Sequence, residues 1–153
     1  MAGKVRVFLD TSALFAGIWS EQGGARMLLK LGEMEVIRLL VSPQVIAEID
    51  AVLRRKAPHL LGLLALLLDE ANVEILTQPS EEARKRASGL VTHPGDALVL
   101  AAALDARPDY FVTLDRAHFL DNDRLTQAVP FPVGTPGDFL AWWRTEAVGE
   151  DTA

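Results

Sequence analysis

Four acidic residues lie at places in the sequence from which their carboxylates could meet. Asp10 and Asp115 each follow a β-rich run. Asp96 lies in the first turn of a predicted helix, and Glu48 lies in the second turn of another. In a parallel sheet, the C-terminal ends of the strands and the N-terminal ends of the crossover helices meet at one edge, where ligands bind. We therefore expect all four at that edge, although 38, 48 and 19 residues separate them along the chain.

Converging carboxylates favour a bound divalent cation. They repel one another, and burial raises their pKa values unless a positive charge lies among them. Oxygen ligands favour Mg²⁺ or Mn²⁺, and such a site supports in-line phosphoryl displacement by a metal-activated water. Each acid alone also has an ordinary interpretation, as a helix cap, a partner of a helix dipole or a solvated side chain. With 21 Asp and Glu in 153 residues, acids at helix starts are expected by chance, so the shared edge is what favours chemistry.

The order of predicted elements indicates an α/β protein. Longer helical patterns alternate with short β-rich runs at residues 5–9, 36–41, 73–76 and 110–114, with a weaker run at 131–133. Alternation of this kind is typical of a parallel sheet covered by helices on both faces. We expect a three-layer α/β/α domain with a central parallel sheet of four to five strands.

Start signals mark five helices. Each begins at a capping residue or a proline, and the predicted helices start at Ser42-Pro43, Pro58, Ser80, Thr92 or His93 with Pro94, and Thr135-Pro136. The first is expected to run to about residue 56, the second to about 71 and the fourth through 104. We expect one domain over residues 1–148 and a disordered tail over 149–153.

Composition excludes several classes of protein. The chain has no cysteine, which excludes disulfide scaffolds, thiolate zinc sites, iron–sulfur clusters and cysteine nucleophiles. Its net charge of −6 argues against a protein that coats nucleic acid, but not against an enzyme that acts on it. His59, His93 and His118 are too scattered to suggest a metal triad by themselves. No secretion signal is visible, and the nine-residue stretch at 60–68 is too short to span a membrane, so we expect a cytoplasmic protein.

Four segments resemble, in order, the motifs of the PIN domain, the fold of the VapC-type toxin ribonucleases. They are VFLDTSALFAG, PQVIAEIDAVL, HPGDALVLAAAL and DYFVTLDRAHFL, and the similarity covers about residues 5–120. The resemblance implies a PIN-like fold and an endoribonuclease that cuts single-stranded RNA with one or two Mg²⁺ or Mn²⁺ ions. It implies that Asp10, Glu48, Asp96 and Asp115 are the metal-binding and catalytic acids. It also implies the toxin of a type II toxin–antitoxin pair, with a cognate antitoxin as partner.

Hydroxyl side chains flank two of these acids. Thr11 or Ser12, after the first acid, and Thr113, two residues before the last, match positions that usually hold a hydroxyl supporting the site. They also fit an ordinary helix cap and an ordinary strand threonine.

The sequence departs from the family pattern after Asp115. Many members carry another acid three or four residues later, where this chain has His118 and Phe119. Asp121 could replace that acid, or a second metal could bind only with substrate. The number of metal ions is therefore left open.

An acidic protein needs local cations to hold RNA. Arg116 is the best placed, beside the acidic edge, and Arg26 is a further candidate. The runs 54–56 and 84–86 are interpreted as solvated helix faces, because the first falls at the helix end remote from the acidic edge.

The predicted helix at 58–71 is apolar on nearly every side. Its apolar residues include positions 60, 61, 63, 64, 66, 67 and 68, so it is either deeply buried or half of an interface. We favour an interface, used for a homodimer or an antitoxin. Two other functions stay open: a catalytically silent PIN-like scaffold that binds RNA or protein, and a PIN-type RNA-processing or DNA flap nuclease.

Overall fold

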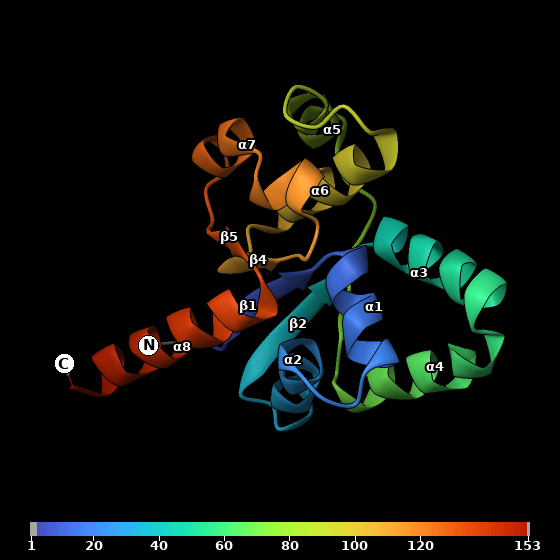
Figure 1. Cartoon of the computed structure of the whole chain (residues 1–153). Coiled ribbons are helices and arrows are strands. Elements are labelled where there is room, and N and C mark those ends of the chain that lie inside the picture. The colour runs from blue at the N-terminus through green and yellow to red at the C-terminus, as the bar shows by residue number, and fades with distance from the viewer. Residues whose placement is uncertain (1–2, 153) are drawn as a thin grey trace.

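Five strands form one parallel sheet in the order β3-β2-β1-β4-β5. The computed structural model describes the backbone of residues 3–152 and the side chains of residues 3–146. The strands are β1 (Val5–Leu9), β2 (Ile37–Val41), β3 (Glu74–Ile75), β4 (Tyr110–Val112) and β5 (Val133–Gly134). Helices cover both faces, with α1 and α2 on one side and α5, α6 and α7 on the other (Figure 1). The predicted three-layer α/β/α class is confirmed.

The two longest strands, β1 and β2, are neighbours in the sheet and lie in the core. Val7, Phe8, Leu39 and Leu40 are completely buried, so β1 and β2 carry apolar side chains on both faces. The weak run predicted at 131–133 is shifted, because β5 occupies Val133–Gly134. Pro132 lacks an N–H, and its carbonyl accepts from Phe111 just before the strand begins.

The helices follow the start signals. They are α1 (Thr11–Trp19), α2 (Gly24–Glu33), α3 (Pro43–Lys56), α4 (Leu61–Glu70), α5 (Glu81–Ser88), α6 (Pro94–Ala106), α7 (Asp123–Ala128) and α8 (Pro136–Thr152), with a 3₁₀ turn η1 (Pro58–Leu60) and a π-helical turn η2 (Arg116–Leu120). Ser42 Oγ accepts from Val45 N–H at 3.1 Å, and Ser80 Oγ accepts from Ala83 N–H at 3.1 Å. His93, rather than Thr92, is the N-cap of α6.

Two helices that precede β2 carry weaker signals. Asp10 caps α1, whereas Gly23 begins α2 without a side-chain hydrogen bond. The pair packs closely because Gly17 lies at their contact. A Cβ added there would stand 2.9 Å from Leu29 Cδ1 and 3.3 Å from the carbonyl oxygen of Ala25.

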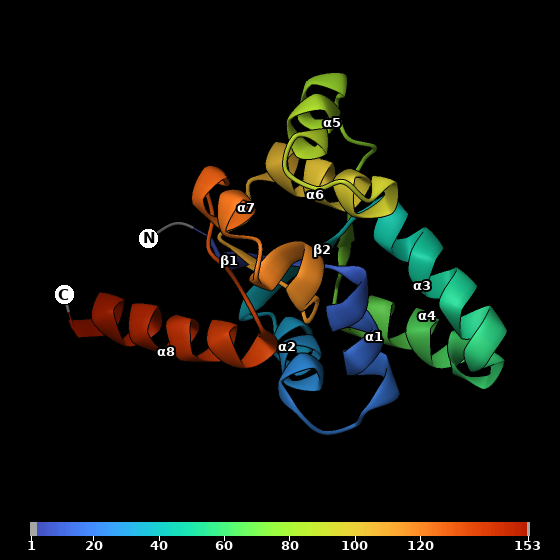
Figure 2. The same ribbon diagram turned by 45° about the horizontal axis from the view of Figure 1, so that its top comes forward.

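The segment after η2 forms a further short helix. Asn122 Oδ1 accepts from Leu125 N–H at 3.0 Å and starts α7, and Leu125 is completely buried. In Figure 2 the orange turn η2 lies in front, between α6 and α1. The predicted helix at 58–71 is divided into η1 and α4.

The apolar helix α4 packs one side against the core through partly buried leucines and leaves the other side exposed. Leu64 is its one buried residue, and Leu66 is 51% exposed. Within residues 3–152, no helix is both long enough and apolar enough to cross a membrane. The tail predicted over 149–153 falls on residues whose side chains are not described, and Ala153 lies outside the described residues.

Candidate active site

The four predicted acids line one cleft of about 350 Å³ at the C-terminal edge of the sheet. Asp10 directly follows β1, and its N–H donates to the carbonyl of Val112 in the neighbouring β4 at 3.1 Å. Asp115 follows β4 three residues later. Strands β2 and β3 lie on one side of β1, and strands β4 and β5 lie on the other side. The C-terminal edge between β1 and β4 is therefore the topological switch point.

Asp10 is almost completely buried, with 4% of its surface exposed. Its Oδ1 accepts from Ser12 Oγ at 2.7 Å and from Ala13 N–H at 2.9 Å, and its Oδ2 accepts from Thr113 Oγ1 at 2.5 Å. Burial raises the pKa of Asp10 to about 6, against the opposing effect of these hydrogen bonds. Asp10 is thus a helix cap and a cleft residue at once.

Two hydroxyls tie the start of α1 to the segment after β4. Ser12 Oγ accepts from Leu114 N–H at 2.9 Å, and Thr113 Oγ1 accepts from Asp115 N–H at 3.0 Å. Thr113 has no exposed surface, so it supports Asp10 and Asp115 from behind rather than facing the cleft. Ser12 lines the cleft.

Glu48 is half-buried at the border between core and cleft. Its Oε2 accepts from Thr11 Oγ1 at 2.9 Å, and its Oε1 accepts from Gln44 Nε2 at 3.0 Å. The start of α6 passes close by at Gly95, where an added Cβ would stand 3.1 Å from Glu48 Oε1. The carboxylate is therefore fixed by α1 and α3 and approached by α6.

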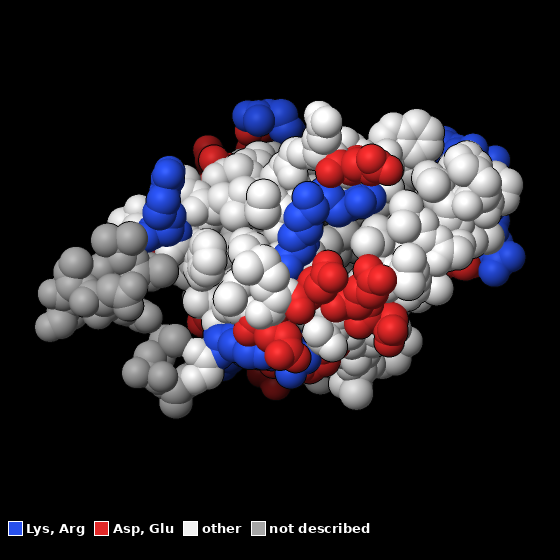
Figure 3. Space-filling view, turned by 90° about the horizontal axis from the view of Figure 1, so that it is seen from below, with Lys and Arg blue, Asp and Glu red and all other residues white. Residues whose placement is uncertain are grey.

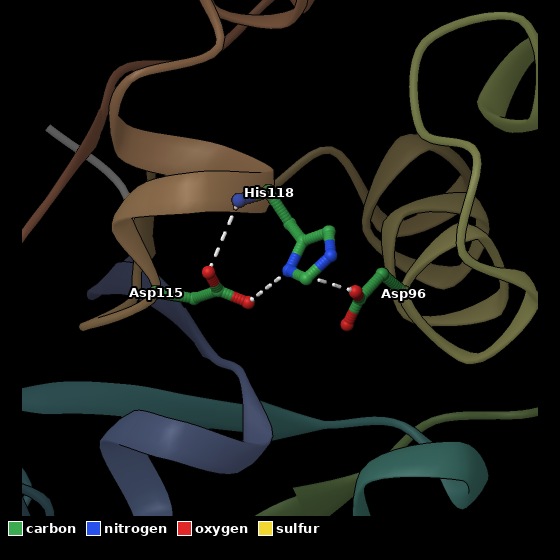
Figure 4. A group of neighbouring side chains, drawn as sticks. All are labelled: Asp96, Asp115 and His118. Carbon is green, nitrogen blue, oxygen red and sulfur yellow. Dashed lines mark hydrogen bonds and ion pairs between the residues drawn. The ribbon is translucent and has the colours of Figure 1, made fainter.

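His118 lies between Asp115 and Asp96 (Figure 4). Its Nδ1 is 2.9 Å from Asp115 Oδ2 and 3.3 Å from Asp96 Oδ2, and its backbone N–H donates to Asp115 Oδ1 at 3.1 Å. The hydrogen bond to Asp115 raises the pKa of His118, and burial raises the pKa of Asp96. The three residues offer one ligand atom each within 4.8 Å of one another.

The sequence analysis missed His118 because it weighed the histidines by their separation along the chain. The available signal was local: His118 follows Asp115 by three residues, a spacing that joins two side chains across one helical turn. The rings of His118 and His93 have centroids 5.7 Å apart, so the fold gathers two of the three histidines. His93 Nδ1 accepts from Asp96 N–H at 3.3 Å, so the second imidazole also lies beside Asp96.

The donor set fits a divalent cation. Two ligand atoms at right angles, each about 2.0–2.2 Å from an ion, lie roughly 3 Å apart. The separations of 2.9 and 3.3 Å from His118 Nδ1 to the two carboxylate oxygens match that spacing. An imidazole nitrogen beside carboxylates suits Mn²⁺ better than Mg²⁺.

The predicted RNA-binding cations are placed differently. Arg116 Nη2 lies 3.3 Å from Asp121 Oδ1, and both side chains are largely exposed and outside the cleft lining. Arg26 instead caps the end of α1, donating from Nε to the Gly17 carbonyl at 2.6 Å. Figure 3 shows one face on which basic side chains stand near acidic ones and uncharged residues cover most of the rest.

Lys56 contradicts the expectation that the run 54–56 lies away from the site. Lys56 lines the cleft, whereas Arg54 pairs with Asp50 at 2.8 Å on the outside of α3. Glu48, Val52 and Lys56 are spaced by four, so they share one face of α3. That spacing was visible in the sequence. The interpretation of Lys56 as solvated rested instead on its position at the C-terminal end of the helix.

Comparisons with known proteins agree with this geometry. The sequence profile of the PIN domain matches residues 6–117, and a comparison with curated proteins finds no match. The fold is similar to VapBC2 from Rickettsia felis, solved bound to a DNA fragment from its promoter, with a TM-score of 0.63 and 16% identity over 84% of this chain and 97% of that one. It is also similar to VapC20 from Mycobacterium tuberculosis, a toxin that cleaves the sarcin–ricin loop, with a TM-score of 0.55 and 16% identity over 75% of this chain and 94% of that one. The profile match spans most of the chain and includes all four acids, and the chain therefore belongs to the PIN domain family.

Proposed function

We propose that this chain is a metal-dependent endoribonuclease that cuts single-stranded RNA, and the toxin of a type II toxin–antitoxin pair. The observation that carries the proposal is the cleft at the switch point, where four carboxylates and His118 gather in a PIN domain. Among the solved structures it resembles, VapC20 is a toxin that cleaves the sarcin–ricin loop, and VapBC2 was solved on a DNA fragment from its promoter. An RNA substrate and an antitoxin partner would place the protein in the cytoplasm.

Asp96, Asp115 and His118 would hold the ion, which is Mn²⁺ or Mg²⁺. When bound, the ion lowers the pKa of a water and stabilises negative charge on the departing oxygen. Asp10 would add a buried negative charge beside that cluster, in an orientation fixed by Ser12 and Thr113.

Glu48 would orient the attacking water. Thr11 and Gln44 hold its two oxygens in place by one hydrogen bond each. Glu48 lines the cleft, so these oxygens can accept a further hydrogen bond from a water there. A carboxylate accepts hydrogen bonds without donating any, so Glu48 suits a water that must present its lone pair to phosphorus.

The proposal is tested by melting temperature against Mn²⁺ concentration. Ion at about 100 times its Kd adds roughly 2.7 kcal/mol, or about 5–10 °C for a domain of this size. We expect this increment in the wild type and its loss in Asp96→Asn. Asp121→Asn, which removes an acid outside the cleft, is the matched control and should retain it.

RNA cleavage and toxicity complete the test. Expression of the wild type should arrest growth and cut a defined cellular RNA, and Asp96→Asn should do neither. A wild type with no metal increment and no toxicity would favour the catalytically silent scaffold instead. Cutting of a DNA flap in preference to RNA would favour the flap nuclease.

We also propose that the chain forms a homodimer through α4. Leu66 is 51% exposed on a helix otherwise rich in leucine, and Trp19 is 60% exposed at the end of α1, a helix that contacts α4. Light scattering should give twice the chain mass, and Leu66→Lys should give the mass of one chain. An unchanged dimer in Leu66→Lys would place the interface elsewhere.

A further inference from the structure

The cleft continues from the acids into a region of different chemistry. Beyond Glu48, it is lined by the apolar side chains of Phe15, Val52, Val99 and Phe119. Val99 and Phe119 are almost completely buried and form the floor, while Phe15 and Val52 are partly exposed and form the walls. The site therefore joins a charged end to an apolar slot.

The slot runs between two helices that start at the sheet edge. Thr11 and Phe15 are four residues apart on α1, as Glu48 and Val52 are on α3, and the hydrogen bond from Thr11 to Glu48 joins the helices at the acidic end. Lys56 lies one further turn along α3, about 12 Å from Glu48 by the helical rise. In Figure 1 the two helices diverge away from the sheet edge.

Lys56 is a free cation at the far end of this slot. Its side chain is exposed, and it makes no ion pair or hydrogen bond with any side chain between residues 3 and 146. An ammonium group that lines a cleft and lacks a carboxylate partner is suited to a phosphate. Its neighbour Arg55 is exposed on the same turn but outside the cleft lining.

We propose that the slot binds one unpaired base of the nucleic-acid strand and that Lys56 binds the phosphate beyond that base. This proposal rests on the proposed function, because the acids must hold the scissile phosphate at the other end. One face of the Phe15 ring stacks on Trp19, with ring centroids 5.7 Å apart, and the other face is the one available to a base. Val52 and Phe119 exclude water. A base within a duplex is covered on both faces and paired at its edge, so the slot admits single strands alone.

The charge at Lys56 is tested with a matched pair of variants. Binding of a fluorescein-labelled hexauridylate is measured by anisotropy with Mg²⁺ at 4 °C, and gels confirm that the oligonucleotide stays intact. Lys56→Gln should weaken binding several-fold and reduce the slope of log K against log salt by about 0.7, the value for one phosphate contact on a single strand. Arg55→Gln should change neither quantity. Equal effects of the two variants would overturn the assignment of Lys56.

The slot is tested by removing bases from the ligand. The wild type should bind the hexamer at least about fivefold more tightly than a hexamer whose two central nucleotides are abasic. Phe15→Leu should lose most of that preference, while Met34→Leu, which changes an exposed apolar side chain outside the cleft lining, should keep it. No preference in the wild type, a loss in Met34→Leu alone, or equal binding of a duplex would each overturn the proposal.

A failure here is separable from a failure of the proposed function. Each variant is also titrated with Mn²⁺ and its melting temperature followed. If Mn²⁺ raises the melting temperature of the wild type but the wild type shows no preference for bases, the base-binding slot alone is overturned. If Mn²⁺ does not raise the melting temperature, the proposed nuclease function is overturned. Equal melting temperatures of the matched variants show that folding is intact.

Discussion

The Nδ1 atom of His118 lies 2.9 Å from the Oδ2 atom of Asp115. A carboxylate only accepts hydrogen bonds, so Nδ1 carries the proton in this contact. A metal ion held by both residues would take the place of that proton and bind the nitrogen lone pair. The identity of residue 118 therefore decides whether the donor set contains nitrogen.

The first prediction concerns metal preference. His118→Asp replaces the nitrogen donor with an oxygen, and nitrogen-containing sites favour Mn²⁺ over Mg²⁺ more strongly than all-oxygen sites. The ratio of the Mg²⁺ and Mn²⁺ dissociation constants, measured by calorimetry, should be about tenfold or more in the wild type and should fall in His118→Asp. An unchanged ratio would show that His118 does not bind the ion.

The second prediction concerns the buried charge of Asp10. Its pKa is raised from 3.8 to about 6 in the folded state, so the ionised form destabilises the metal-free protein above pH 6. As pH falls from about 6 towards 3.8, the folded state takes up the proton first and the penalty disappears. Asp10→Asn should therefore raise the free energy of unfolding at pH 8 by up to about 3 kcal/mol, with EDTA present, and by much less at pH 4.5. Urea denaturation at both pH values measures this, and an equal gain at both would contradict it.

The third prediction separates the contribution of the Thr113 hydroxyl from that of the side-chain volume. Thr113→Val keeps the volume but leaves Asp10 Oδ2 and the N–H of Asp115 without their partner, which costs about 1–3 kcal/mol. Mn²⁺ affinity should also fall, because Asp115 loses the bond that fixes its backbone. Thr113→Ser, which keeps the hydroxyl, should retain most of the metal affinity. Thermal unfolding with and without Mn²⁺ measures both effects.

The fourth prediction uses two helical glycines. Gly17→Ala would place a methyl group 2.9 Å from Leu29 Cδ1 and 3.3 Å from a backbone oxygen of α2, so we expect a loss of about 1–3 kcal/mol. Gly62 in α4 has open space around an added Cβ, and Gly62→Ala should stabilise by about 0.5–1 kcal/mol. Urea denaturation of both variants gives the comparison, and a stabilising Gly17→Ala would show that α1 and α2 can separate freely.

The sequence was sufficient to predict those elements that are marked by short local patterns. The strand at Val5–Leu9 and the helix at Pro43–Lys56 were predicted at their observed bounds, because apolar runs and a Ser-Pro start are local signals. The placement of four acids on one edge followed from the topology of parallel sheets, and all four line the cleft. Their roles as metal ligands stay a prediction.

The sequence was insufficient where a side chain acts across the fold. Arg26 was expected near RNA, but the carbonyls at the end of α1 are satisfied by its guanidinium, which no local pattern reveals. Lys56 was assigned to solvent because only its position along α3 was considered, and that position is far from the sheet edge. In the structure, α1 forms the facing wall of a cleft that extends as far as Lys56. Both errors concern long cations, whose reach depends on what packs beside them.

The assembly of the cleft across the switch point has a consequence during synthesis. Asp10 emerges from the ribosome early, but its partner Thr113 and the side chains of Asp115 and His118 follow more than one hundred residues later, after a strand that must insert beside β1. No shorter N-terminal fragment contains the set. Under the proposed function, a nascent chain would therefore stay inactive until its last third has docked, and truncated products of a stalled ribosome would cut no RNA.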